Sequence, residues 1–280
     1  GEWAEAKGEP FDWWGSLIYA ASLVLLITGS SNLDLGLWAW VMGAVGTAGL
    51  GAFLLFEAHI TYPILNIALL RDNRIFALSN LAAMLNYAAT FGITFFLSLY
   101  LQYVKGMNPR EAGMVLMIQP IVQASFSPLC GRLADRYPAA KVATLGMALC
   151  AVGVGIAATI GQATPLWMIM IMLGVLGFGF ALFSSPNVSV IMGSVPSRYL
   201  GVASGLNGSV RTLGMMSSMT IITIIFSIFM KGHAVAPETL PAFLTSMQTS
   251  LLIFCGFCGV GIFCSFGRFE REGEKEGEAS

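Results

Sequence analysis

The chain has 280 residues, of which 56% are hydrophobic and 10% are charged, and its formal net charge is −1. Ordinary globular domains carry about 25% charged residues, so this composition predicts a protein embedded in a lipid bilayer. A net charge near zero, with its few cations in loops, excludes the basic surface that a nucleic-acid-binding protein needs.

The amino-terminal part of the chain predicts a short soluble segment followed by two membrane spans. The first residue is Gly1 rather than Met, and residues 1–12 lack the basic and then apolar layout of a signal peptide. We predict that residues 1–12 form a cytoplasmic segment and that the sequence is a piece of a longer protein. A span needs about 20 mostly apolar residues. Two such runs, joined by a polar turn, predict a transmembrane hairpin over residues 13–57.

Residues 58–75 predict an amphipathic cytoplasmic linker. Pro63 suits the first turn of a helix, and Leu65, Ala68 and Leu69 fall on one helical face. A helix of this kind lies in the plane of the membrane interface.

Six further apolar runs lie within residues 76–266, and the tail, residues 267–280, is rich in Glu and Gly and predicts a disordered cytoplasmic segment. The predicted fold class is therefore an all-α membrane protein with eight transmembrane helices, in which a two-helix hairpin precedes a six-helix bundle. The six runs are residues 76–104, 112–134, 142–160, 166–195, 202–230 and 243–266.

The distribution of Lys and Arg predicts the orientation, because cytoplasmic loops carry the excess of these residues. One set of loops holds ten of them and the other holds three, which places both termini in the cytoplasm of a multi-pass protein of the cell membrane. The ten are Lys7, Arg71, Arg74, Arg132, Arg136, Lys141, Arg198, Arg268, Arg271 and Lys275, and the three are Lys105, Arg110 and Lys231.

A charged turn at residues 131–141 separates two of the apolar runs, and its polarity predicts a membrane surface. The spacing Gly-x-Leu-Ala-Asp-Arg resembles the loop between the second and third helices of a six-helix half in the major facilitator superfamily. The resemblance implies a gating loop formed by Gly131, Asp135, Arg136 and Lys141. The family pattern continues D-R-x-G-R-[RK], whereas residues 138–140 here are Pro-Ala-Ala, so this copy is degenerate. An ordinary basic cytoplasmic loop is the alternative interpretation.

Two further segments resemble one branch of that superfamily. Residues 194–205, followed by Arg-Thr-Leu-Gly at 211–214, are similar to the V-P-x-x-x-x-G-x-A-S-G segment of the fourteen-span drug:proton antiporters of the EmrB/QacA type. The stretch from residues 63–66 to residues 80–82 also resembles this family. The predicted hairpin lies at the position where this family inserts two extra spans. The resemblance implies a carboxyl-terminal six-helix half whose amino-terminal half is missing. It also implies efflux of drugs or small amphipathic organic molecules by proton-coupled alternating access.

The predicted substrate cavity is built from polar residues within the spans that the family places around its centre. Gln119 and Gln123 share a helix face because they are four residues apart. No Asp or Glu falls in the middle of a span, so we predict that the proton-carrying residue belongs to the missing half. The cavity residues are Asn86, Tyr87, Gln119, Gln123, Asn187, Asn207 and Arg211.

Alternatives remain for these residues. Buried amides also form hydrogen bonds between helices without a substrate, and Arg211 could extend toward the headgroups from a span that begins later than predicted. Apolar side chains that re-pack around different shapes would complete the cavity wall, although Met and Phe at helical spacing more often face lipid or pack within the bundle. They are Met84, Phe91, Phe95, Tyr100, Met117, Phe126, Met215 and Met219.

The sequence contains no GxSxG, HExxH or phosphate-binding glycine loop, so we predict neither an enzyme nor a bound cofactor. Cys255 and Cys258 have ligand-like spacing, but no His or second Cys pair completes a metal site, and we predict structural thiols. The expected partners are the lipid bilayer, the missing half, a small organic substrate and the proton. The alternatives are a metabolite or siderophore exporter of the same fold and a truncated, non-transporting membrane module.

Overall fold

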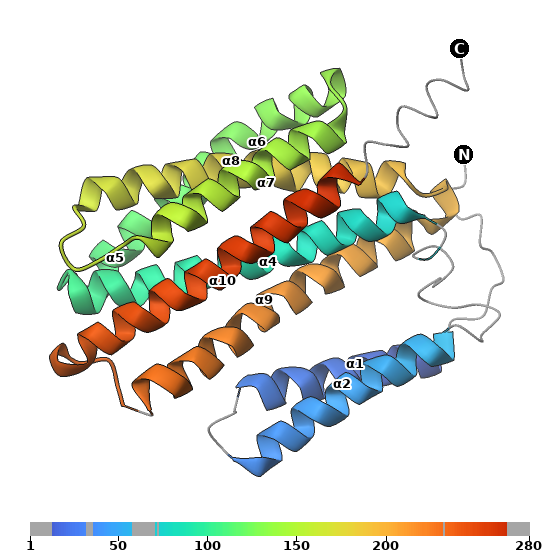
Figure 1. The fold of residues 1–280 in the computed structure, drawn as a ribbon. Coiled ribbons are helices and arrows are strands. Elements are labelled where there is room, and N and C mark those ends of the chain that lie inside the picture. The colour runs from blue at the N-terminus through green and yellow to red at the C-terminus, as the bar shows by residue number, and fades with distance from the viewer. Residues whose placement is uncertain (1–12, 32–35, 58–70, 72, 232, 268–280) are drawn as a thin grey trace.

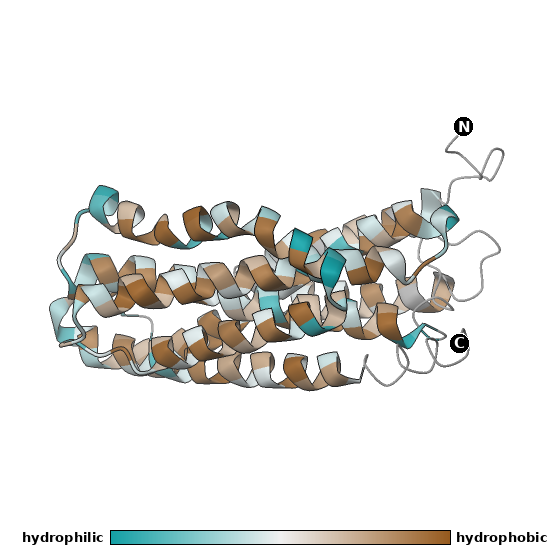
Figure 2. Ribbon diagram, turned by 90° about the horizontal axis from the view of Figure 1, so that it is seen from above, coloured by the Kyte–Doolittle hydropathy of each residue, from teal (hydrophilic) through white to brown (hydrophobic). Residues whose placement is uncertain are grey.

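The computed structural model describes residues 13–31, 36–57, 71, 73–231 and 233–267, and this part of the chain is helical with no β-strand. The predicted amphipathic linker at residues 58–75 and the predicted tail lie almost entirely outside the described residues. Six of the described helices are long and apolar enough to cross a membrane, and hydrophobic residues run along the length of the bundle (Figure 2).

The six spans follow the predicted apolar runs, with one break that the sequence analysis did not anticipate. Of these six spans, the second (residues 109–136) consists of two helices, and the first (residues 74–104) ends in a π-helical turn. In chain order the elements are α4 (Arg74–Leu99) with η2 (Tyr100–Val104), α5 (Pro109–Leu116) with α6 (Ile118–Arg136), α7 (Ala139–Ala158), α8 (Leu166–Gly193), η3 (Ser197–Tyr199) with α9 (Leu200–Met230), and η4 (Pro237–Thr239) with α10 (Leu240–Phe266).

Side-chain caps fix the starts of two spans. The Asn73 side chain accepts a hydrogen bond from the backbone N–H of Phe76 at the start of α4, and it donates a second one to the carbonyl of Ser194 at 2.6 Å. Asn108 and Glu111 form a reciprocal capping box at α5, with Pro109 in the first turn. Asn73 therefore ties the start of α4 to the end of α8.

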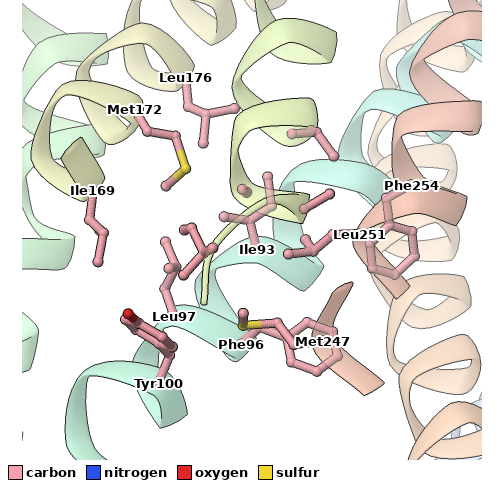
Figure 3. Close-up of a cluster of buried hydrophobic side chains, with 14 of the residues drawn as sticks. Ile93, Phe96, Leu97, Tyr100, Ile169, Met172, Leu176, Met247, Leu251 and Phe254 are labelled. Carbon is pink, nitrogen blue, oxygen red and sulfur yellow. The ribbon is translucent and has the colours of Figure 1, made fainter. Parts of the chain in front are cut away.

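Helix α4 lies at the centre of the bundle, in contact with α7, α8, α9 and α10 (Figure 1). The main hydrophobic core forms where α4 meets α8 and α10, in a cluster that includes Ile93, Phe96, Met172, Met247 and Phe254 (Figure 3). In contrast, only 6% of the most apolar stretch of the α5–α6 span is buried, against 56% for α4 and for α8. Helix α6 packs mainly on α8 and leaves most of its surface open.

Three hydrogen bonds fix the connection between α7 and α8 to two other helices. The Tyr100 hydroxyl donates to the carbonyl of Gly161 at 2.8 Å, and the Lys105 ammonium donates to the carbonyl of Gln162 at 2.9 Å. From α10, the Gln248 amide donates to the carbonyl of Ile160 at 2.9 Å. The backbone carbonyls that follow α7 are therefore satisfied by side chains of η2, its flank and α10.

The predicted hairpin appears as α1 (Trp13–Ser31) and α2 (Leu37–Glu57), which pack against each other. Glycine permits this packing, because a Cβ at Gly29 would lie 2.7 Å from the carbonyl oxygen of Ala39. The apolar stretches of the two helices, Trp13–Leu26 and Leu37–Phe53, are shorter than the other six spans. That these two helices also cross the bilayer, giving eight spans, stays a prediction.

Topology can be tested with cysteine labelling. The turn at residue 139 and the loop at residue 163 lie at opposite ends of α7. We expect single cysteines at Ala139 and Ser280 to react with a membrane-impermeant maleimide only from the cytoplasm, and one at Ala163 only from outside. Labelling of Ala139 and Ala163 from the same face would contradict the predicted orientation.

Candidate functional site

Tyr87 lies near the middle of α4 and contacts residues of two other helices. It lies 13 residues after Arg74 and 12 before Leu99, the two ends of α4. Its ring meets Phe180 of α8 edge to face, with centroids 5.4 Å apart, and the Arg211 guanidinium carbon of α9 lies 5.3 Å from its centroid. Cation–π contacts of this kind hold a guanidinium without neutralising its charge.

Arg211 of α9 carries an exposed positive charge beside the Tyr87 ring. It lies roughly 16 Å along α9 from Leu200, at a rise of about 1.5 Å per residue, and its side chain is exposed. Within the described part of the chain it makes no ion pair and no side-chain hydrogen bond, and half-buried Asn207 lies one turn before it on the same helix. Its guanidinium lies over the midpoint of α4 rather than at the end of the helix.

Two predicted cavity residues are buried between helices instead of lining an open surface. Asn86 of α4 is 0% exposed, and apart from a weak contact with the Cys150 thiol of α7 neither polar atom of its side chain has a hydrogen-bond partner among the described residues. Asn187 of α8 is 1% exposed and donates to the carbonyl of Ser79 at 3.2 Å. In this conformation the close packing of α4 against α7 and α8 separates both amides from any substrate.

The two glutamines occupy a different helix from Tyr87 and Arg211. Gln119 and Gln123 are half-buried on α6, and Gly177 of α8 lets the two helices approach, because a Cβ there would lie 3.2 Å from the Cα of Gln119. The structure therefore brings Tyr87, Arg211 and Phe180 into contact but not the α6 amides with them.

The residues of the predicted apolar wall also differ in their exposure. Phe126 of α6 is 40% exposed and meets Phe178 of α8 edge to face at 5.1 Å, and Phe91 is also partly exposed. Tyr100 is 0% exposed and belongs to the main core, so its assignment to the wall is corrected. Its hydroxyl is engaged by the loop after α7, as described above.

The proposed gating loop lies where α6 ends and α7 begins. Gly131 is half-buried near Ser185 of α8, whereas Asp135, Arg136 and Lys141 are exposed. A carboxylate in the last turn of α6 and an ammonium in the first turn of α7 both oppose the helix dipole. Asp135 forms no ion pair with any described residue, so nothing local explains its position by helix stability.

The described residues contain no group of three or more His, Cys, Asp or Glu side chains that could hold a metal ion. All five cysteines are free thiols.

A sequence profile of the Major Facilitator Superfamily matches residues 80–280. The chain belongs to this superfamily. The match begins inside α4, so it includes the six spans and excludes the α1–α2 hairpin.

Individual relatives within and around the superfamily are transport and resistance proteins. The chain is 23% identical to the riboflavin transporter RibZ of Clostridioides difficile (strain 630) over 92% of its own length and 56% of that protein. It is 30% identical to a tetracycline resistance determinant of Streptomyces rimosus over 68% of its own length and 56% of that protein. The chain therefore spans only about half of each relative.

The fold has a counterpart among solved structures. The crystal structure of the nucleoside transporter NupG aligns with a TM-score of 0.58 at 17% sequence identity, covering 89% of this chain and 64% of that one. At this identity the likeness concerns the fold alone.

Two residues that contact predicted cavity residues, Phe180 and Cys150, were not predicted from the sequence. Phe180, which supports the Tyr87 ring, lies in a continuous apolar run without any polar marker. Cys150, beside Asn86, was not among the residues expected at the cavity. The repeated Gly-Phe pairs at residues 177–180 were the available signal, because small residues mark close approach between helices in a membrane.

Asp135 offers a direct test of the gating loop in a superfamily transporter. We expect Asp135→Asn in the full-length protein to lower the transport rate severalfold while membrane insertion is unchanged, because a carboxylate that opposes its own helix dipole needs a partner elsewhere. Lys141→Gln serves as the companion variant, since Lys141 is equally exposed. If Asp135→Asn transports at the parental rate, the segment is an ordinary charged turn.

Proposed function

We propose that this chain is the carboxyl-terminal part of a fourteen-span drug:proton antiporter that exports drugs or small amphipathic organic molecules from the cell. In this proposal both termini are cytoplasmic, and the protein works in the cell membrane by alternating access. The observation that supports the proposal is the contact of Tyr87 with Phe180 and Arg211, which brings two rings and an exposed cation together from three spans. Rings and methionines suit the recognition of varied organic molecules.

The open face of α6 supports the proposed missing half. Ile121, Phe126 and Leu129 are exposed on this helix, and exposure to lipid would explain these apolar residues. However, exposed Ser125 and half-buried Gln119 and Gln123 lie on the same little-buried helix. Because polar groups are costly in hydrocarbon, this surface favours a protein partner or a water-filled cavity over lipid.

Drug export is favoured by the tetracycline resistance determinant among the relatives. Metabolite transport is the second candidate, and the riboflavin transporter, which aligns with 92% of this chain, favours it. Proton coupling rests on the family resemblance, and its carrier would lie outside the six described spans, whose Asp and Glu residues Glu111, Asp135 and Glu238 are all at helix ends.

Inverted membrane vesicles containing the full-length protein would test this function. We expect proton-driven uptake of a fluorescent drug analogue, abolished by a protonophore, and no uptake by vesicles that contain this chain alone. Uptake of riboflavin without uptake of any drug analogue would favour the second candidate. Absence of transport for all compounds in the full-length protein would contradict both transport candidates.

A further inference from the structure

We propose that Arg211 makes this transporter select substrates that carry an anionic oxygen group, such as a carboxylate or a phosphate. The inference deepens the proposed function and rests on it, because it gives a charge class to a substrate that would enter the same cavity. It derives from the position, contacts and accessibility of a single cation.

The position of Arg211 separates it from a residue anchored at the membrane surface. An arginine near the bilayer interface extends its long side chain toward the headgroups. Here the guanidinium carbon lies 5.3 Å from the ring centroid of Tyr87, which is at the midpoint of α4. The charge is therefore held at mid-depth, where ionised groups normally face a cavity or a partner.

The contacts of Arg211 leave its hydrogen-bonding groups available. A guanidinium has five N–H donors in a planar fork that matches carboxylate and phosphate oxygens. In the described ranges the side chain contacts the Tyr87 ring and makes no hydrogen bond and no ion pair. The edge-to-face packing of Phe180 on Tyr87 fixes the ring that supports the cation.

The other charges of the six spans do not compensate Arg211. Glu111 belongs to the capping box of α5, Asp135 to the last turn of α6 and Glu238 to the turn before α10. The mid-membrane charge contributed by these spans is therefore positive. An anionic substrate would complete the pairing at this cation, whereas a lipophilic cation would be repelled by it.

The test compares two xanthene dyes of similar size and opposite charge. Purified full-length protein in detergent is titrated against anionic fluorescein and cationic rhodamine 6G, and binding is followed by fluorescence anisotropy against empty micelles. We expect Arg211→Gln to weaken fluorescein binding at least tenfold while rhodamine 6G binding stays the same or strengthens. Arg211→Lys, which keeps the charge but loses the fork, should give an intermediate loss.

The chain offers a matched control in Arg198→Gln. Arg198 is also exposed and also lies over a tyrosine, with its guanidinium carbon 4.6 Å from the Tyr199 ring centroid, but it belongs to the turn before α9. We expect this variant to bind both dyes as the parent does.

Three results would overturn the proposal: no fluorescein binding by the parent, unchanged fluorescein binding in Arg211→Gln, or an equal loss for both dyes. An equal loss would assign Arg211 to an ion pair with an acid elsewhere in the protein. The proposed export function is judged separately, by dye uptake into inverted vesicles. If the parent binds fluorescein through Arg211 but moves neither dye, export fails and the binding preference stands.

Discussion

Gly146→Leu should prevent the close packing of α7 on α8 and severely destabilise the bundle. A Cβ at Gly146 would fall on the backbone nitrogen of Phe183 and lie 2.6 Å from the carbonyl carbon of Leu182. Gly179 makes the reciprocal approach, because its Cβ would lie 2.9 Å from the backbone nitrogen of Cys150. Overpacking that side chains can relieve costs about 1–3 kcal/mol. Backbone atoms cannot rotate away, so we expect a cost at the upper end of that range or above.

The measurement is the midpoint of thermal unfolding of the purified protein in detergent, together with the yield of monodisperse protein. Gly174→Leu is the control, because Gly174 belongs to α8 as well and a Cβ there meets nothing within 4 Å. We expect Gly174→Leu to unfold close to the parental midpoint. Equal midpoints for the two variants would mean that α7 and α8 do not pack backbone to backbone.

Asn86→Leu should have the opposite effect on stability and a large effect on transport. The amide of Asn86 is fully buried, and apart from a weak contact with the Cys150 thiol neither polar atom is hydrogen-bonded among the described residues. An unsatisfied buried polar group costs about 1–3 kcal/mol, and leucine has the same branching without polar atoms. We therefore expect a higher unfolding midpoint. A group kept in an unfavourable state normally serves function, so we expect transport by the full-length protein to fall at least tenfold.

Thr90→Val provides a control with the opposite sign. Thr90 lies one turn further along α4, and its hydroxyl donates to the carbonyl of Asn86 at 2.9 Å. Removing this satisfied hydrogen bond should lower stability by about 1 kcal/mol. A lower midpoint for Asn86→Leu would indicate that its amide is satisfied in the membrane, and unchanged transport would exclude a role in the transport cycle.

Apolar length was enough to predict the six spans of the bundle, but local signals shift their limits. The run expected at residues 166–195 corresponds to α8, Leu166–Gly193. The span formed by α5 and α6 instead begins at Pro109, because the capping box of Asn108 and Glu111 starts a helix before the apolar run does. This span also breaks at Met117. Counting apolar residues cannot detect a polar helix start of this kind.

The site was predictable as a set of residues but not as a set of contacts. Tyr87 and Arg211 were both expected in the cavity, and their polarity within apolar runs was the reason. Their contact depends on Gly214, which brings α9 against α4, because a Cβ there would lie 3.2 Å from the backbone nitrogen of Ala88. The burial of Asn86 likewise depends on how α4 packs on its neighbours. A single sequence does not contain the choice of helix partners.

The hydrogen bonds that hold the loop after α7 constrain how the bundle can move. Tyr100, Lys105 and Gln248 bind three consecutive carbonyls, at residues 160–162, from two different parts of the chain. Displacing α7 alone at this end would break all three hydrogen bonds together. These three hydrogen bonds therefore link the ends of α4, α7 and α10 to one another. In the described residues α6 and α9 have no such attachment to this loop, so this constraint does not act on these two helices.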